Sequence, residues 1–360
     1  MESMELKQFF QDKKVFVTGH TGFKGAWLCW WLKTLGAEVT GFALPPVDTR
    51  GNLFNLTTLK SEINSIEADI NDLTKLTKAL QKSTAQIVLH LAAQPLVLAS
   101  YDDPVGNYQT NVMGTINMLE AIRQSPNVQA SVMVTTDKCY ENKEWLWPYK
   151  ETDQLGGHDP YSSSKAMAEI AISAYYRSFL KQKNIGIASA RAGNVIGGGD
   201  FADNRIIPDI VESIVEHKTL TLRNPNAIRP WQHVLDALYG YLQLTKSLYT
   251  DRETFSTSFN FSPQDNSNQH TVEYITQTFI DACGVGEYCI DSKEAEVHEA
   301  TNLRLDASKA RSMLCWQPAF TTQQGIGFTA SWYKNHLNKT NNPKDYTLEQ
   351  IATYNKLINQ

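Results

Sequence analysis

The alternation of apolar and polar positions along the first half of the chain predicts strands and helices in regular succession. Short apolar runs, which are typical of buried strands, are separated by longer segments whose apolar residues fall on one helical face. The predicted strands are residues 14–19, 38–44, 63–70, 85–93 and 185–193, with another that ends at Val134. The predicted helices are residues 23–35, 72–82, 104–124 and 163–180. This order indicates an α/β fold with a doubly wound parallel sheet covered by helices on both faces.

The pattern loosens after residue 194, where Gly-, Asn- and Pro-rich stretches such as GNVIGGGDFADN and RNPNAIRP interrupt it. Helical segments are expected at 205–217 and 230–248. We therefore expect a sheet domain at 1–194 and, mainly from 195–360, a smaller carboxyl-terminal lobe that binds substrate over the ligand edge of the sheet. The chain is expected to cross between these two parts.

The composition disfavours several classes of protein. A formal net charge of −5 over 360 residues argues against a broad nucleic-acid-binding surface. The five cysteines are irregularly spaced and form no CxxC pair, so no metal site or disulfide framework is predicted, and reduced cysteines favour a cytoplasmic location. The start of the chain lacks the features of a signal peptide, and the apolar stretch 25–36 is too short for a membrane span.

A glycine-rich turn joins the first predicted strand to the first predicted helix. The stretch VTGHTGFKG places Gly19, Gly22 and Gly25 at GxxGxxG spacing. Glycines let the backbone approach a pyrophosphate closely, and the following helix directs its unpaired N–H groups at the same anion. The context predicts a Rossmann-type dinucleotide site that includes Thr21 and Phe23, with NAD as the expected cofactor.

The end of the second predicted strand bears on the choice between NAD and NADP. An acidic residue there would bind the adenosine ribose of NAD, but GFALPPVDTR offers no carboxylate before Asp48. Arg50 could instead favour the 2′-phosphate of NADP, which stays open. Asp69, followed by Ile70, is a candidate for the adenine amino group, and a helix-capping role for Asp69 is an equal alternative.

The stretch VMVTTDKCYE carries polar residues directly after a predicted buried strand. Val134 is followed by two threonines and then by Asp137 and Lys138. In open α/β sheets the carboxyl ends of the strands are where ligands bind. Taken alone, the stretch fits a strand followed by a solvated turn better than it fits a site.

Tyr161 and Lys165 lie four residues apart in YSSSK, at the predicted start of a helix. Residues at this spacing share one helical face, so a phenol and an ammonium can act on one site. A nearby cation lowers the pKa of a tyrosine, and we therefore expect Tyr161 to serve as a base. The pair follows Thr136 by 25 residues.

These motifs together resemble the extended short-chain dehydrogenase/reductase family over nearly the whole chain. The resemblance rests on TGHTGFKG, HLAAQ (90–94), the Thr before YSSSK, and RAGNVIG (191–197). It implies that Thr136, Tyr161 and Lys165 hold and deprotonate a sugar hydroxyl while NAD accepts a hydride, and that Tyr161 and Lys165 also contact the cofactor. It further implies cofactor contacts at Ala92 and Ala93 and a substrate contact at Gln94.

The residues after Thr136 resemble those of the nucleotide-sugar 4,6-dehydratases in this family. That resemblance implies oxidation at C4, removal of the C5 proton, loss of the C6 hydroxyl as water and return of hydride to C6, with Asp137 as the acid. Most such enzymes carry Glu as the C5 base where this chain has Lys138. Asp-Lys resembles the branch acting on CDP-glucose, as do GHTGFKG, TTDKCYEN and RPWQHV. The base therefore stays open between Lys138 and Glu141.

The same resemblance implies a set of substrate-binding residues in the second half of the chain. Asn194 and Arg205 match a segment that closes over the sugar nucleotide, and Arg229 in RPWQHV matches an arginine that binds pyrophosphate through its fork of donors. Arg304 is a weaker phosphate candidate. Trp231 and His233 are expected to be packing residues.

Other functions stay open from the sequence. An NAD-dependent nucleotide-sugar 4-epimerase would share Thr136, Tyr161 and Lys165 but would have no use for Asp137 and Lys138. A 4,6-dehydratase for another nucleotide sugar and a catalytically idle dinucleotide-binding protein are further alternatives. The resemblance implies a homodimer or higher homo-oligomer through the helix at 163–180. It also implies a place in deoxysugar supply for bacterial surface polysaccharide such as lipopolysaccharide O-antigen.

Overall fold

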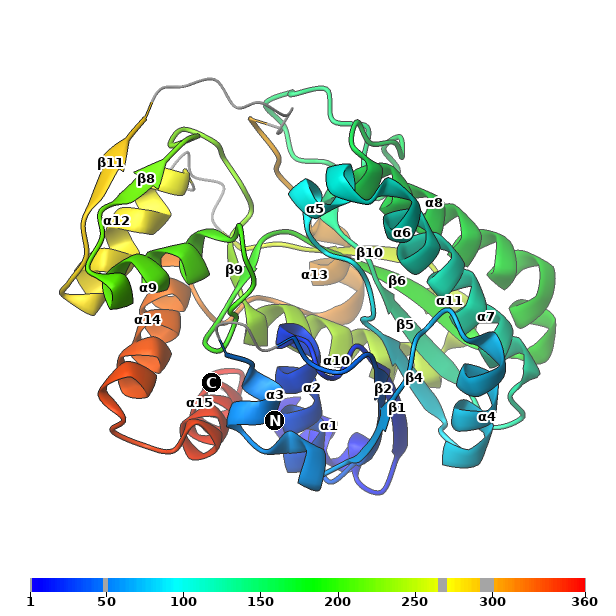
Figure 1. The fold of residues 1–360 in the computed structure, drawn as a ribbon. Helices are drawn as coiled ribbons and strands as arrows, with labels where there is room; N and C mark the ends of the chain where they lie inside the picture. Colours follow the sequence, from blue (N-terminus) through cyan, green and yellow to red (C-terminus); the bar gives the residue numbers. More distant parts are fainter. Residues whose placement is uncertain (1, 48–50, 265–270, 292–300, 360) are drawn as a thin grey trace.

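The core of the protein is a seven-stranded parallel sheet (Figure 1). The structure, a computed structural model, describes residues 2–47, 51–264, 271–291 and 301–359. The strand order is β10-β6-β5-β4-β1-β2-β3, and the order reverses between β1 and β4. The strands are β1 (Lys14–Thr18), β2 (Glu38–Ala43), β3 (Asn64–Glu67), β4 (Ile87–His90), β5 (Ala130–Val134), β6 (Gly186–Ala192) and β10 (Ser258–Phe261). The predicted doubly wound parallel sheet is confirmed.

Both faces of the sheet carry a hydrophobic core, and side chains along β1, β4, β5 and β6 alternate between the two cores. Val15 and Val17 point into one core, and Phe16 between them points into the other. The first face is covered by α2 (Phe23–Thr34) and α10 (Val234–Thr250), with α1 (Glu2–Phe10) and α15 (Pro343–Leu357) packed outside them. The second face is covered by α4 (Leu73–Ser83), α7 (Gly114–Gln124) and α8 (Pro160–Tyr175).

A smaller group of elements, drawn on the left of Figure 1, lies beside the sheet. α12 packs against α9 and α14, and two short parallel pairs, β8 with β11 and β7 with β9, complete this region. Its members are β7 (Val195–Ile196), α9 (Ile206–Glu216), β8 (Leu220–Leu222), β9 (Gln232–His233), α12 (Val272–Cys283), β11 (Tyr288–Ile290) and α14 (Thr322–Asn338). The division at residue 194 stays a prediction, and the seventh strand, β10, comes from beyond it.

Five further α-helices in the described part of the chain are short. They are α3 (Leu53–Leu56), α5 (Val97–Asp102), α6 (Pro104–Tyr108), α11 (Arg252–Phe255) and α13 (Ser308–Leu314). Within the residues described, no helix combines the length and the apolar character needed to cross a membrane.

Helix α8 begins three residues before the predicted start at 163, because Asp159 caps it. The Asp159 carboxylate accepts from the Ser162 backbone N–H at 2.9 Å, and Pro160 occupies the first turn, where a missing N–H costs nothing. This start places Tyr161 inside the first turn of the helix. The predicted helix at 104–124 is interrupted by a π-helical segment at Gln109–Met113, which apolar periodicity does not reveal.

Candidate active site

The glycine turn between β1 and α2 is packed too tightly for side chains at two of its three glycines. Gly19 has a φ of +75°, and a Cβ there would lie 2.8 Å from the Ala92 backbone nitrogen. A Cβ on Gly25 would lie 2.1 Å from the Gly19 carbonyl oxygen. Gly22 is exposed and precedes the first residue of α2. At these glycines no side chain covers the backbone near the N-terminus of α2, so a dinucleotide pyrophosphate can approach the backbone N–H groups closely.

The other predicted cofactor residues lie around this turn. The Thr21 hydroxyl donates to the Leu44 carbonyl at 3.0 Å, and Phe23 is half-buried at the start of α2. Ile70 is buried, whereas Asp69 is exposed and accepts from the Asn71 backbone N–H at 2.9 Å. Asp72, accepting from the Lys75 backbone N–H, caps α4, so the capping alternative for Asp69 is wrong. Ala92 and Ala93 are half-buried after β4. Asp48 and Arg50, which bear on NADP, lie outside the described residues.

Tyr161 and Lys165 project from the first two turns of α8, and both side chains are buried. Burial raises the pKa of Tyr161 to about 12, although a hydrogen bond with Thr136 and the charge of Arg205 oppose the rise. Burial lowers the pKa of Lys165 to about 8. The expected lowering of the Tyr161 pKa below its ordinary value is therefore wrong for this structure, because loss of hydration outweighs the neighbouring groups.

Thr136 and Asp137 follow β5 and face Tyr161. The Thr136 hydroxyl donates to the Asp137 carboxylate at 3.0 Å and accepts from the Lys138 backbone N–H at 3.3 Å. Asp137 is fully buried, and its Oδ2 atom has no hydrogen-bond partner among the described residues. Burial raises the Asp137 pKa, which the nearby charges of Lys138 and Arg229 oppose. Because burial favours the protonated form of this carboxyl, Asp137 is suited to act as a general acid.

Lys138 is half-buried in the one-turn 3₁₀ helix Asp137–Cys139. It lines a hollow together with Glu141, His158 and Asp159. The remaining lining residues are Val97, Tyr140, Asn142, Gly157, Ser162 and Leu303. Both candidate C5 bases, Lys138 and Glu141, therefore face the same cavity.

Two of the three predicted substrate-binding arginines contribute charge at this site. Arg205 forms an ion pair with Asp200 at 2.9 Å, and its charge acts on Tyr161. Arg229 is buried and donates to the Ile228 carbonyl at 2.9 Å. Its charge opposes the rise in the Asp137 pKa that burial causes. Arg304 lies in the loop before α13 and donates to Asn302 at 3.2 Å.

The two predicted substrate residues without charge are held by neighbouring backbone or amide groups. The Asn194 carbonyl accepts from the Gln232 backbone N–H at 3.0 Å. The Gln94 side-chain oxygen accepts from Asn107 at 2.8 Å. Trp231 and His233 are buried, and His233 caps α10, so their assignment as packing residues stays a prediction that burial supports.

Sequence reasoning missed two polar groups at the site. Asn111, in the π-helical segment, donates to the Ser164 hydroxyl at 2.9 Å and accepts from the Gln94 backbone N–H at 2.9 Å. Burial lowers the pKa of Lys24 to about 7, and the charges of Arg205 and Lys165 add to this effect. The position of Lys24 within the glycine turn motif is the one signal that could have identified it.

The fold and much of the sequence are similar to known nucleotide-sugar enzymes. The CDP-glucose 4,6-dehydratase of Salmonella typhimurium is 45% identical over 333 residues, covering 91% of this chain and 92% of the relative. The dTDP-glucose 4,6-dehydratase of Xanthomonas campestris pv. campestris is 26% identical over 358 residues, covering 93% of this chain and 98% of the relative.

A solved structure supports the fold independently. The dTDP-glucose 4,6-dehydratase of Streptomyces venezuelae, solved with NAD bound, superposes with a TM-score of 0.76 at 22% identity and covers 90% of this chain and 98% of its own. The family model described as GDP-mannose 4,6 dehydratase matches residues 16–329. The chain therefore belongs to this family, among the extended short-chain dehydrogenases/reductases.

Proposed function

We propose that this protein is an NAD-dependent CDP-glucose 4,6-dehydratase that converts CDP-D-glucose to CDP-4-keto-6-deoxy-D-glucose and water. The observation that carries the reaction type is the buried Asp137, whose Oδ2 lacks a partner among the described residues, beside Thr136 and Tyr161. An epimerase has no use for an acid at this position. The 45% identity to a CDP-glucose 4,6-dehydratase over 91% of the chain supports the choice of nucleotide.

The glycine turn fits NAD, because the cradle at Gly19 and Gly25 has no room for a Cβ and sits at the start of α2. Its pyrophosphate would lie on residues 19–25, and Asp69, Ile70, Ala92 and Ala93 would line the adenosine side. When bound, NAD supplies a reversible hydride acceptor, so the overall reaction is redox-neutral.

Tyr161 acts on the C4 hydroxyl of the sugar. As a phenolate hydrogen-bonded with Thr136, Tyr161 takes the hydroxyl proton, and the positive charge of Arg205 favours that phenolate. Because burial holds the Tyr161 pKa at about 12, the phenol is protonated at neutral pH until further positive charge, which bound NAD would supply, favours its deprotonation.

Asp137 acts on the C6 hydroxyl. Burial favours the protonated form of its carboxyl, and delivering that proton to the hydroxyl oxygen lets the C6–O bond break with release of water. We propose Lys138 as the base that removes the C5 proton, since it is adjacent to Asp137 and lines the same cavity as Glu141. Glu141 is the alternative base.

Arg205, Arg229 and Arg304 are proposed to bind the pyrophosphate of the substrate, with Asn194 and Gln94 beside it. Planar guanidinium groups match phosphate oxygens in pairs. Arg205 would have to share its donors between Asp200 and the phosphate.

The test is incubation of the purified protein with NAD and, in separate reactions, with CDP-glucose, UDP-glucose, dTDP-glucose and GDP-mannose. The expected result is loss of one water from CDP-glucose alone, seen by mass and by the absorbance of the alkali-treated 4-ketone, without net NADH. An isomer of unchanged mass would identify an epimerase instead. Dehydration of another nucleotide sugar in place of CDP-glucose would show that the proposed substrate is wrong and identify the right one.

We also propose that the protein is a homodimer that pairs through α8. Met167 and Ile170 lie three residues apart on this helix and are 50% and 58% exposed. Phe179, in the π-helical segment that continues α8, and Met113, beside α7, are exposed as well. Four exposed apolar side chains on adjacent helices favour a partner of the same kind.

A further inference from the structure

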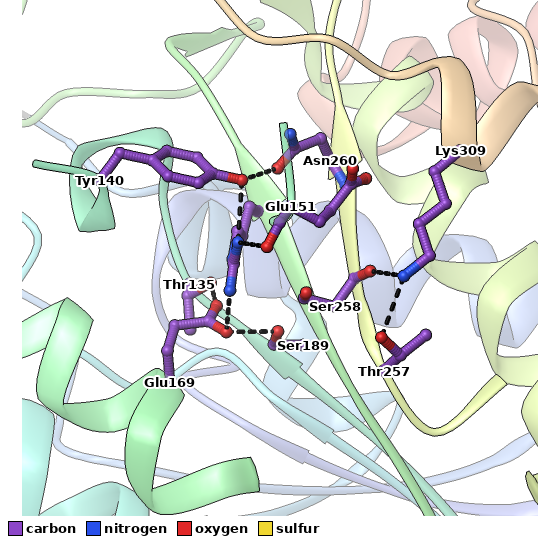
Figure 2. A network of polar contacts seen from close by, with 10 residues as sticks. Thr135, Tyr140, Glu151, Glu169, Ser189, Thr257, Ser258, Asn260 and Lys309 are labelled. Atoms are coloured by element: carbon purple, nitrogen blue, oxygen red, sulfur yellow. Dashed lines mark hydrogen bonds and ion pairs between the residues drawn. The ribbon is translucent and has the colours of Figure 1, made fainter. Parts of the chain in front are cut away.

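A buried ion pair lies between the catalytic helix and the sheet. Glu169 of α8 and Arg191 of β6 approach to 2.8 Å, and each side chain is 4% exposed. Glu169 also accepts hydrogen bonds from the hydroxyls of Thr135 and of Ser189, the latter at 2.7 Å. Figure 2 shows Glu169 pointing from its helix toward Thr135 and Ser189. These contacts keep the Glu169 pKa below its ordinary value despite burial.

Glu169 contacts both elements that carry the catalytic side chains. It follows Lys165 by four residues, as Lys165 follows Tyr161, so the three side chains lie along one face of α8. Thr135, which donates to Glu169, directly precedes Thr136 at the end of β5. One carboxylate therefore joins the helix that holds Tyr161 to the strand end that holds its hydrogen-bond partner.

Arg191 is fixed from the opposite side. It donates to the Tyr140 hydroxyl at 2.8 Å, and that hydroxyl donates to Asn260 at 2.7 Å. The Asn260 side-chain amide donates to the carbonyls of Tyr149 and Asp306, at 3.0 and 3.1 Å. Since these bonds hold the guanidinium in place, its pairing with Glu169 has a defined geometry.

The charges that act on Lys165 come from few groups. Lys24 from α2 repels it, and His90 from β4 is neutral near pH 7 because burial lowers its pKa to about 3. Cys139, after β5, stays a thiol because burial raises its pKa. Among the residues that the structure describes, Glu169 is the carboxylate whose charge opposes the effect of burial on the Lys165 pKa.

We propose that Glu169 is a positioning residue that keeps Lys165 protonated during turnover, and that Arg191 maintains the charge of Glu169. The proposal rests on the proposed dehydratase function, in which Lys165 must be a cation to favour the Tyr161 phenolate. Its consequence is that turnover at alkaline pH depends on a residue that does not line the substrate site.

Two variants test the proposal. Glu169→Gln removes the carboxylate charge but leaves the buried Arg191 uncompensated, which is costly for folding. The double variant Glu169→Gln/Arg191→Met removes both charges and avoids that cost. Glu120→Gln is the control, because Glu120 pairs with Arg123 on the surface helix α7, away from the site.

The first readout is the pH profile of kcat/KM for dehydration of CDP-glucose. Loss of the Glu169 charge makes Lys165 easier to deprotonate, so the alkaline limb is expected to move to lower pH by about one unit in both variants. The Glu120→Gln profile is expected to match the original protein. A folded double variant with an unshifted alkaline limb would overturn the proposal, since a purely structural pair changes the height of the profile and not its position.

The second readout does not depend on activity. The ¹³Cε shift of labelled Lys165, assigned by its loss in Lys165→Arg, gives the pH at which this lysine titrates. We expect that pH to fall by about one unit in the double variant. Titration at an unchanged pH would contradict the role of Glu169 even if CDP-glucose is not the substrate, whereas failure of the unaltered protein to dehydrate CDP-glucose would contradict the proposed function alone.

Discussion

At the scale of single residues, the buried carboxyl of Asp137 is the group with the clearest expected effect on chemistry. We predict that Asp137→Asn lowers kcat for water loss from CDP-glucose by about 10²- to 10⁴-fold, because an amide cannot donate the proton that a general acid supplies. The measurement is product formation by mass spectrometry. Thermal unfolding of the same variant is the control.

That control has a definite expectation. Asp137 is buried with one oxygen unpartnered among the described residues, so replacing the carboxyl by an amide is not expected to destabilise the protein. If kcat of Asp137→Asn lies within a factor of two of that of the original protein, Asp137 is not the general acid. A large fall in melting temperature would assign its role to folding.

A second residue-scale prediction concerns the glycine turn. A methyl group on Gly25 would meet the Gly19 carbonyl oxygen at 2.1 Å, so Gly25→Ala must open the turn and weaken NAD binding, by at least about tenfold. Gly327→Ala is the matched control. Its methyl group would meet no described atom within 4 Å. Because position 327 lies inside α14, the change from Gly to Ala is expected to increase the free energy of unfolding by up to about 1 kcal/mol. Calorimetric titration with NAD distinguishes the two, and equal affinity in both variants would contradict the prediction.

Residue types and spacing could locate the catalytic residues but not their charge states. The strand end at Val134 and the YSSSK motif placed Thr136, Tyr161 and Lys165 near one another, and the structure brings them together. The pKa of Tyr161 could not be anticipated, because it depends on burial by elements distant in sequence. The lowered pKa of Lys24 could not be predicted for the same reason.

At the scale of elements, α15 is joined to α10 through a buried carboxyl. The Tyr354 hydroxyl of α15 donates to Asp236 of α10 at 2.7 Å, and the Ala319 backbone N–H donates to the same oxygen at 2.7 Å. Burial nevertheless raises the Asp236 pKa to about 7. The contact between the two helices is therefore sensitive to pH.

The sign of this effect follows from linkage. Because the folded state binds the Asp236 proton more tightly than the unfolded state, stability is expected to fall as pH rises from about 4 to about 7, by at most about 1.4 kcal/mol per pH unit. In Asp236→Asn the melting temperature is expected to depend less on pH over that range. Tyr354→Phe removes a bond that lowers the pKa, so the fall is expected to extend to higher pH. Parallel curves for all three proteins would contradict the assignment.

The elements that sequence periodicity predicted best are those that alternate in the sheet. The strand at 14–19 and the helix at 23–35 are observed as β1 and α2 within one residue at each end. Helices α1 and α5 were not predicted, because α1 is short and only weakly amphipathic and α5 has only six residues. β10 was missed because its four residues carry too little pattern.

At the scale of the whole molecule, the proposed dimer gives a prediction about mass. Ile170→Glu places a charge in the proposed contact and is expected to convert the dimer to a monomer, since burying an unpaired carboxylate is costly. Light scattering after size exclusion measures the mass. Val285→Glu is the control, because Val285 is similarly exposed but lies between α12 and β11, away from α8. A dimer that survives Ile170→Glu would place the interface elsewhere.

The sequence position of β10 has a consequence for synthesis of the protein. β10 pairs with β6, yet about 70 residues separate the end of β6 from the end of β10. At translation rates of roughly 5–20 residues per second, β10 is synthesised roughly 3–14 seconds after β6, and the backbone edge of β6 is unpaired during that time. During that interval the nascent chain carries an open strand edge, and Arg191 lacks the network that Asn260 completes. Cotranslational chaperone binding is therefore expected to peak while this edge is uncovered, and to decline once β10 has left the ribosome.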